Sequence, residues 1–338
     1  MERFLKSKYK IGEKIGEDAF TVTYKGTFLG QENQVVIKIY KRSALNGELI
    51  KIMRQKVKNL TQIRHNSISP LIDGDYGWQG FYYVRGYLPH KTLREFMDQN
   101  KPLTIAQAVK LINNIGEALA FAHKNGFIHG ALSPHNVFVA DSAHQVILTD
   151  FVIEGEIKNS SPQKAGLISH KAEYLSPEEI KGAPASFSSD IYSLGLLFYE
   201  MLSGENPFKQ NSSLDGALKK LTSAPPKIRE KNQNVPPLVE NIIEGSLAQD
   251  PLLRFKNIEA LLKSLNSNAP QETSAAIDLP IINYEDAESA KAKASLEEKK
   301  QAAVEEHESM FKSWTIRLAV FFIAAGILYT LLFMFLRF

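Results

Sequence analysis

The chain has 338 residues, 44% hydrophobic and 23% charged, which excludes a wholly disordered chain and a protein with many membrane spans. Its 40 Lys and Arg residues against 37 Asp and Glu leave a net charge of +3, so we predict no nucleic-acid partner. Cysteine is absent, which excludes disulfides, thiolate metal ligands and a cysteine nucleophile. The first ten residues are charged and lack the apolar core of a signal peptide, so we expect no export.

The early part of the chain alternates in the manner of strands, and the later part has helical spacing. The predicted strands are Tyr9–Ile15, Thr21–Phe28 and Gln34–Tyr40, with a further pair ending near Tyr87 after a helix over Leu45–Ile63. From Leu93 onward apolar residues recur every three or four positions, notably in Ala106–Ala122 and Asp190–Ser203. A small strand-rich lobe over residues 1–88 is therefore expected to precede a helical lobe over residues 89–266.

A polar spacer and an apolar tail follow the break at residues 266–270. The spacer, residues 267–313, is rich in Ala, Glu and Lys between 285 and 312, which is typical of a solvated helical linker; a coiled coil is the weaker alternative. In the tail, residues 314–338, the uncharged run Leu318–Leu336 would reach ~28 Å as a helix, close to the thickness of a bilayer core. Arg317 and Arg337 flank it, and Trp314 lies where an interfacial aromatic would. We predict a transmembrane helix, in preference to a buried helix or a glycolipid-anchor signal.

Short motifs run through the two lobes in a fixed order. Tyr9–Ile15 leads into Gly16-Glu17-Asp18-Ala19-Phe20-Thr21-Val22, and Val36-Ile37-Lys38 and His123–Asn136 follow, then Asp150-Phe151-Val152, Ser176-Pro177-Glu178, Asp190-Ile191-Tyr192-Ser193-Leu194-Gly195 and Arg254. In type, order and spacing these motifs resemble the Hanks-type Ser/Thr protein kinase family across about residues 9–265. The resemblance implies an α+β, bilobal protein-kinase-like fold, with a β-rich N-lobe and a helical C-lobe, plus the C-terminal transmembrane helix.

The resemblance also implies a nucleotide and a metal. Phosphoryl transfer needs ATP held by its phosphates and Mg²⁺ to neutralise them. The implied nucleotide-binding residues are Gly16, Val22, Lys38, Asn136 and Asp150. Of these, Asn136 and Asp150 would coordinate Mg²⁺.

The catalytic positions of the family are replaced. Where the family has His-Arg-Asp, this chain has His129-Gly130-Ala131, and Ala131 cannot accept a proton from a substrate hydroxyl. Ser133 stands at the position of the phosphate-contacting lysine, and Lys171 at that of the activation-segment threonine. Because these three positions act as one unit in the family, we expect no catalytic residues and little or no transfer.

The nucleotide end also departs from the family pattern. Gly16 is the one remaining loop glycine, with Asp18 and Thr21 at the other two positions, and a carboxylate at Asp18 would repel phosphates unless it points away. Counting back from His65 puts Lys56 where a glutamate should pair with Lys38; a slip of one would give Gln55, also no carboxylate. Glu48 lies too far along the helix to substitute easily.

One arginine is unexpected behind the cleft. The alignment places Arg85 at the usually apolar gatekeeper position, where a buried guanidinium needs a partner. Asp150 is one candidate, and such a pair would compete with a metal; a shift of the register by one is the alternative.

The residues implied to hold the fold are intact. They are His129, Glu178, Asp190 and Arg254, of which Glu178 and Arg254 would form a buried ion pair and Asp190 would cap the backbone of the catalytic loop. We therefore predict a membrane-anchored pseudokinase that binds nucleotide or protein partners at the membrane, with the kinase-like domain in the cytoplasm and a bacterial inner membrane favoured. The alternatives are a weakly active or atypical kinase, with His135 or Asp141 replacing the lost base, and a structural module with an empty cleft.

Overall fold

The computed structural model describes residues 3–18, 20–30, 33–77, 79–140, 145–151, 172–210 and 213–267, all within one compact unit, Met1–Glu272. The second unit, Thr273–Phe338, lies outside these ranges, as do the predicted transmembrane helix, nearly all of the predicted spacer, Asp141 and Lys171. A search of the described residues finds no helix with the length and apolar character needed to cross a membrane.

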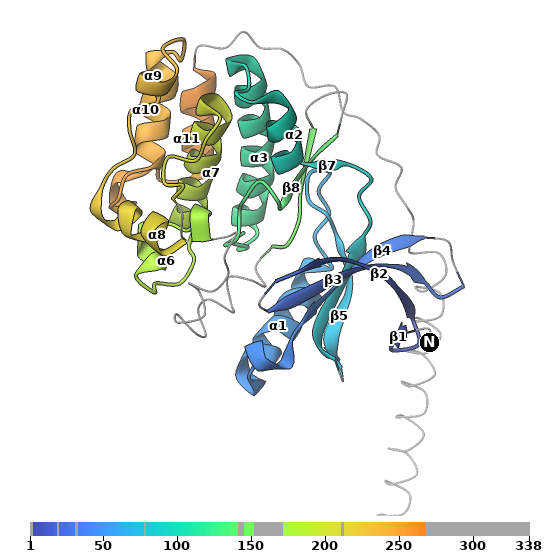
Figure 1. Cartoon of the computed structure of the whole chain (residues 1–338). Helices are drawn as coiled ribbons and strands as arrows, with labels where there is room; N and C mark the ends of the chain where they lie inside the picture. The colour runs from blue at the N-terminus through green and yellow to red at the C-terminus, as the bar shows by residue number, and fades with distance from the viewer. Residues whose placement is uncertain are drawn as a thin grey trace, which may run out of the picture. The chain divides into compact units, whose positions relative to one another are not determined.

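Within the described residues, six strands of the N-lobe form one antiparallel sheet in the order β1-β2-β3-β4-β6-β5 (Figure 1). The strands are β1 (Arg3–Leu5), β2 (Tyr9–Glu17), β3 (Thr21–Phe28), β4 (Gln34–Tyr40), β5 (Leu71–Gly77) and β6 (Gly80–Gly86). The bounds of β3 and β4 agree with those predicted. β2 runs past the predicted Ile15 to Glu17, because it continues to pair with β3 through two irregularities in register.

Helix α1 (Gly47–Leu60) packs against β5 through Leu49, Met53 and Val57, whose three-and-four spacing puts them on one buried face. The helix begins after the predicted Leu45 because the Asn46 side chain accepts a hydrogen bond from the backbone N–H of Leu49, at 2.8 Å, and so caps it.

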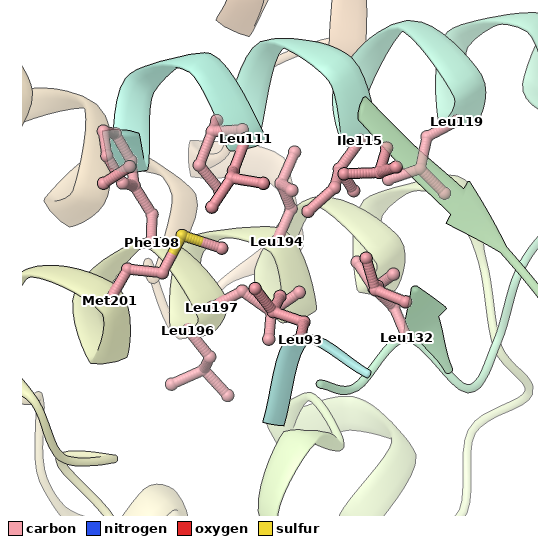
Figure 2. Close-up of a cluster of buried hydrophobic side chains, with 14 of the residues drawn as sticks. Leu93, Leu111, Ile115, Leu119, Leu132, Leu194, Leu196, Leu197, Phe198 and Met201 are labelled. Atoms are coloured by element: carbon pink, nitrogen blue, oxygen red, sulfur yellow. The ribbon is translucent and has the colours of Figure 1, made fainter. Parts of the chain in front are cut away.

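The C-lobe is helical, and its core lies between α3 (Ile105–Lys124) and α7 (Phe187–Ser203). Figure 2 shows Leu111, Ile115 and Leu119 of α3 facing side chains of α7 such as Leu194 and Leu197. Around this pair lie α2 (Leu93–Asn100), α6 (Pro177–Ile180), α8 (Ser213–Thr222), α9 (Ile228–Lys231), α10 (Pro237–Ser246) and α11 (Ile258–Asn266) (Figure 1). Short 3-10 turns cover Arg42–Ala44, Ala172–Tyr174 and Pro251–Leu253.

A small antiparallel sheet, β7 (Lys91–Thr92), β8 (Val137–Ala140) and β9 (Gln145–Leu148), packs against α2 and α3 of the C-lobe. Because β8 and β9 are antiparallel, the residue before β8 meets the residue after β9: the backbone N–H of Thr149 donates to the carbonyl of Asn136 at 2.9 Å. Leu148 in turn exchanges backbone hydrogen bonds with Ser67 and Ser69, at 2.9 and 2.8 Å. The end of β9 is thereby fixed against the N-lobe, which places Asp150 beneath the large sheet.

Candidate functional site

The lysine predicted to bind nucleotide lies on β4, opposite β6. Lys38 is paired in register with Tyr83, and Val36 with Arg85. Since alternate residues of a strand point to the same side, Tyr83 and Arg85 share one face of β6. The polar side chains of Lys38, Tyr83 and Arg85 are all buried, so each needs a partner in the folded protein.

That partner is the Asp150 carboxylate. Lys38 Nζ lies 2.8 Å from Asp150 Oδ2, with the two side chains only 7% and 12% exposed. The Tyr83 hydroxyl donates a hydrogen bond to Oδ1 of the same carboxylate. Arg85 Nε lies 4.0 Å from Oδ1, close enough for an ion pair and too far for a hydrogen bond. Asp150 itself has a left-handed backbone, with φ at +64°, which Asp tolerates better than most residues.

Other contacts hold Arg85 in place. Its Nη1 donates to the carbonyl of Gly86 at 3.1 Å, and its guanidinium lies 5.4 Å from the centre of the Phe138 ring. Among the described residues, Arg85 Nε is buried without a hydrogen-bond acceptor. Asp150 is one of the alternatives that the sequence left open for Arg85, and the structure brings the two together as a loose ion pair.

The catalytic loop is fixed by Asp190, at the first turn of α7. Its carboxylate accepts hydrogen bonds from the backbone N–H groups of His129 and Gly130, at 2.7 and 2.8 Å, and lies 2.8 Å from His123 Nε2. Gly130 has φ at +65°, the left-handed region in which a glycine carries no steric penalty. The His129 ring stacks on Phe151, with ring centres 4.4 Å apart. These contacts fix the backbone of the catalytic loop, independently of the chemistry that its side chains offer.

Two positions that carry catalytic side chains in the family, 131 and 133, have neither a carboxylate nor a cation in this chain. Ala131 offers only a methyl, and its carbonyl accepts a hydrogen bond from Asn136 Nδ2 at 2.8 Å. Ser133 is 1% exposed, and its hydroxyl has no hydrogen-bond partner within the described part of the chain. Lys171, the third changed position, lies outside the described residues.

A cavity of about 200 Å³ lies under the β2–β3 turn. It is lined by Gly16, Glu17, Asp18, Thr21, Thr23, Lys38 and His135. Two of the predicted nucleotide-binding residues, Gly16 and Lys38, therefore meet here, whereas Asn136 and Asp150 are not among the lining residues. Val22 is not among them either. Because β3 alternates, its neighbours Thr21 and Thr23 face the cavity instead, and the sequence analysis overlooked Thr23.

The side-chain carboxylate of Asp18 forms hydrogen bonds within its own loop. Its Oδ1 accepts hydrogen bonds from the backbone N–H groups of Phe20 and Thr21, at 2.8 and 2.7 Å, and its Oδ2 accepts one from the Thr21 hydroxyl at 2.8 Å. Lys41 ties the loop down by donating to the Asp18 carbonyl and the Glu17 carboxylate, at 3.0 and 2.8 Å. Hydrogen bonds from Lys41 and Lys14 lower the pKa of Glu17 to about 2. A protein carboxylate thus occupies backbone donors of the kind that would otherwise bind an anion.

Helix α1 provides no carboxylate to Lys38 in the described contacts. Lys56 is half-buried on α1, whereas Gln55 is exposed and donates to Asn59 at 3.0 Å. Glu48 lies exposed in the first turn of the helix. The carboxylate paired with Lys38 is Asp150.

An ion pair braces the C-lobe. Both terminal nitrogens of Arg254 reach the Glu178 carboxylate at 2.7 Å, and its Nε donates to the Ala248 carbonyl at 2.8 Å. Burial is the largest single influence and tends to raise the pKa of Glu178, but the hydrogen bonds to its carboxylate and the charge of Arg254 together outweigh burial, so the pKa is lowered. Such a bidentate, buried pair fixes α6 against the start of α11.

A second buried network, missed by the sequence analysis, holds the chain beside α6. The Tyr174 hydroxyl donates to Glu200, and Arg94 Nη1 lies 2.7 Å from the other oxygen of Glu200. Burial raises the pKa of Tyr174 well above its usual value, so its hydroxyl stays protonated and remains a donor. Lys220, also buried, donates to the Leu175 carbonyl at 3.1 Å. No local motif marks this set, because its members come from four separate segments.

Comparison with known proteins identifies the family. Residues 9–265 match the protein kinase domain. The chain is 30% identical over 256 residues to serine/threonine-protein kinase PrkC of Bacillus subtilis (strain 168), and 31% identical over 259 residues to a Lactococcus lactis subsp. lactis (strain IL1403) protein named PknB. Each alignment covers 75% of this chain but only 39% and 41% of those relatives, so the chain spans about two fifths of their length.

Solved structures support the same fold. A crystal structure of Rad53 residues 1–466 in complex with AMP-PNP superimposes with a TM-score of 0.62 at 19% identity, covering 75% of this chain and 63% of that one. The bilobal fold predicted from the motifs is therefore confirmed, with a β-sheet N-lobe and a helical C-lobe. The chain belongs to the Hanks-type Ser/Thr protein kinase family.

Proposed function

We propose that this protein is a membrane-anchored pseudokinase, a protein-kinase-like domain that transfers little or no phosphate and acts as a nucleotide- or partner-binding signalling scaffold. One observation carries the proposal: Ala131 occupies the position of the catalytic base, in a loop whose backbone Asp190 and Asn136 hold in place. The loss is therefore one of chemistry and not of folding.

The expected deficit is large. A positioned general base contributes about 10²–10⁴-fold, or ~2.7–5.4 kcal/mol of barrier. Ser133 replaces a cation that would stabilise the transferring phosphoryl group, and the penalties are not additive because such residues act together.

ATP is the proposed ligand of the cavity beneath the β2–β3 turn. Gly16 and Lys38 line it, and the Rad53 structure contains the ATP analogue AMP-PNP. At about 200 Å³ the cavity is smaller than the ~300–1,000 Å³ of typical ligand pockets, so it would enclose only part of a nucleotide.

Residual kinase activity is the second candidate. His135 lines the same cavity as Lys38, and an imidazole there is a conceivable base for phosphoryl transfer. Relatives such as PrkC are named serine/threonine-protein kinases.

Incubation of the purified full chain with ATP labelled on its γ-phosphate and a general protein substrate separates the two candidates. A pseudokinase gives no transfer above that of the Lys38→Ala variant. Transfer by the wild-type chain that Lys38→Ala abolishes would overturn the proposal, and its loss in His135→Ala would assign the replacement base.

The membrane anchor is proposed from sequence. The uncharged run Leu318–Leu336 would span the bilayer and leave the kinase-like domain in the cytoplasm near a protein partner. The two relatives described above are bacterial, which favours a bacterial inner membrane. We expect the full chain to stay in the membrane pellet after an alkaline carbonate wash and a variant lacking residues 314–338 to be released. Release of the full chain would refute the anchor.

A further inference from the structure

The family's metal would have to bind at Asp150, and the residues around Asp150 do not fit a divalent cation. In protein kinases this aspartate and the catalytic-loop asparagine coordinate Mg²⁺, a hard ion that requires oxygen ligands. Here Lys38 contacts one oxygen of Asp150 at 2.8 Å, and Tyr83 donates to the other. The amide nitrogen of Asn136 donates to the carbonyl of Ala131, which leaves its side-chain oxygen as the one ligand it could offer a cation. Among the described residues, no group of three His, Asp or Glu side chains could hold a metal.

The Lys38 contact alone would not exclude a metal, because a flexible lysine can turn away to a bound phosphate. Arg85 is different. It belongs to the rigid sheet, its Nη1 is anchored on the Gly86 carbonyl, and its guanidinium lies over the Phe138 ring. Its Nε, buried and without an acceptor within the described chain, lies 4.0 Å from Asp150 Oδ1.

The charges of the buried side chains around Asp150 also disfavour a divalent cation. In the described contacts, the three charged residues Lys38, Arg85 and Asp150 together carry +1. Their side chains are 7%, 9% and 12% exposed, so water screens them poorly. A divalent cation at Asp150 would enter a site that already holds an excess of positive charge. A polyphosphate anion beside Lys38 would compensate that charge.

We propose that this cleft binds a nucleoside triphosphate as the free anion, without a divalent metal, with Arg85 as the built-in counter-ion of Asp150. When the nucleotide binds, the Lys38 ammonium leaves the Asp150 carboxylate and contacts the phosphates. Arg85 and Tyr83 then remain as the partners of Asp150. The inference rests on the proposed nucleotide-binding function and specifies that the nucleotide binds without a metal ion.

Calorimetric titration of the full chain in detergent with ATP tests this proposal, once in excess EDTA and once in excess Mg²⁺. We expect Kd values that agree within about threefold for the wild type. In Arg85→Met, which restores an apolar gatekeeper, Mg²⁺ should tighten ATP binding about tenfold or more. Arg85→Lys keeps the charge and is the matched control, expected to remain indifferent to metal.

A second readout uses Mn²⁺ alone, followed by its electron paramagnetic resonance signal. Mn²⁺ should bind to Arg85→Met and not to the wild type at the same concentration. Wild-type ATP binding that is at least tenfold tighter in Mg²⁺ would overturn the inference, and so would Mn²⁺ binding to the wild type at Asp150, recognised by its loss in Asp150→Asn. Absence of ATP binding in both buffers would also overturn it, while leaving a partner-binding pseudokinase intact. The wild-type measurements decide the question even if Arg85→Met fails to fold.

Discussion

Replacing Asp150 by Asn should destabilise the fold strongly, because it removes the carboxylate that two buried cations share in the described contacts. Asn keeps the shape of the side chain but removes the charge that Lys38 and Arg85 share. Loss of one partner from a buried ion pair costs ~3–5 kcal/mol. At about 2–4 °C per kcal/mol for a domain of this size, the melting temperature should fall by roughly 6–20 °C.

The same reasoning predicts how Arg85→Met combines with Asp150→Asn. Alone, Arg85→Met should cost only ~1–2 kcal/mol, the worth of one hydrogen bond and a contact with the Phe138 ring, since Met fills much of the space. In the Asp150→Asn background it removes one of the two buried cations that have lost the shared carboxylate. The double variant should therefore be more stable than Asp150→Asn itself, a favourable coupling of ~1 kcal/mol or more.

Asp75 offers a matched control. Its carboxylate also receives two cations, Lys6 and Arg54, but it is 30% exposed on the surface of the sheet. Asp75→Asn should cost ~0–1 kcal/mol, since water screens that pair. Urea unfolding of the full chain, followed by far-ultraviolet circular dichroism, measures all four variants. A cost below ~1 kcal/mol for Asp150→Asn, or strictly additive effects in the double variant, would refute a buried and shared counter-ion.

Three further predictions concern other parts of the domain. Asp18→Gly frees the backbone donors of Phe20 and Thr21 and should tighten ATP binding about tenfold, the worth of one charged hydrogen bond of ~1.5 kcal/mol; unchanged calorimetric affinity would contradict this. Burial lowers the pKa of His65 below its usual 6.5, so the unfolded chain binds this proton more readily and stability should fall as the pH drops below about 6.5; His65→Asn should flatten the profile between pH 7.5 and 5 in urea unfolding. Arg254→Met should cost ~3–5 kcal/mol by the same assay, and a loss below ~1 kcal/mol would show that the ion pair with Glu178 does not brace the C-lobe.

The features that the sequence predicted are those with a local signal. The strands Thr21–Phe28 and Gln34–Tyr40 have clear alternation, and the structure reproduces their bounds. The gatekeeper alignment singled out Arg85 and pointed to Asp150 because a buried guanidinium requires a partner. Each of these inferences needed only a short window of sequence or the alignment of one motif.

Other features depend on residues that only the fold brings together. The Tyr83 hydroxyl reaches the Asp150 carboxylate because β6 pairs with β4 in the register that sets Tyr83 opposite Lys38. In the sequence, a tyrosine within an apolar strand does not indicate a polar partner. Asp18 looked like a source of repulsion for phosphate. Its carboxylate instead turns back on its own loop, a choice that depends on the turn geometry and not on residue type.

On the proposed pseudokinase function, the contrast between Asp190 and Ala131 explains in physical terms how a kinase fold is retained without its reaction. Asp190 is buried and accepts two backbone hydrogen bonds, so its loss would leave donors unsatisfied in the core and cost folding energy. A catalytic carboxylate at position 131 would point its charge toward a substrate and contribute little to the fold, so Ala131 removes chemistry at small structural cost. Asp150 resembles Asp190 in this respect, because its buried carboxylate contacts Lys38 at 2.8 Å and lies 4.0 Å from Arg85. An aspartate kept for that reason predicts a folded cleft and carries no evidence of catalysis.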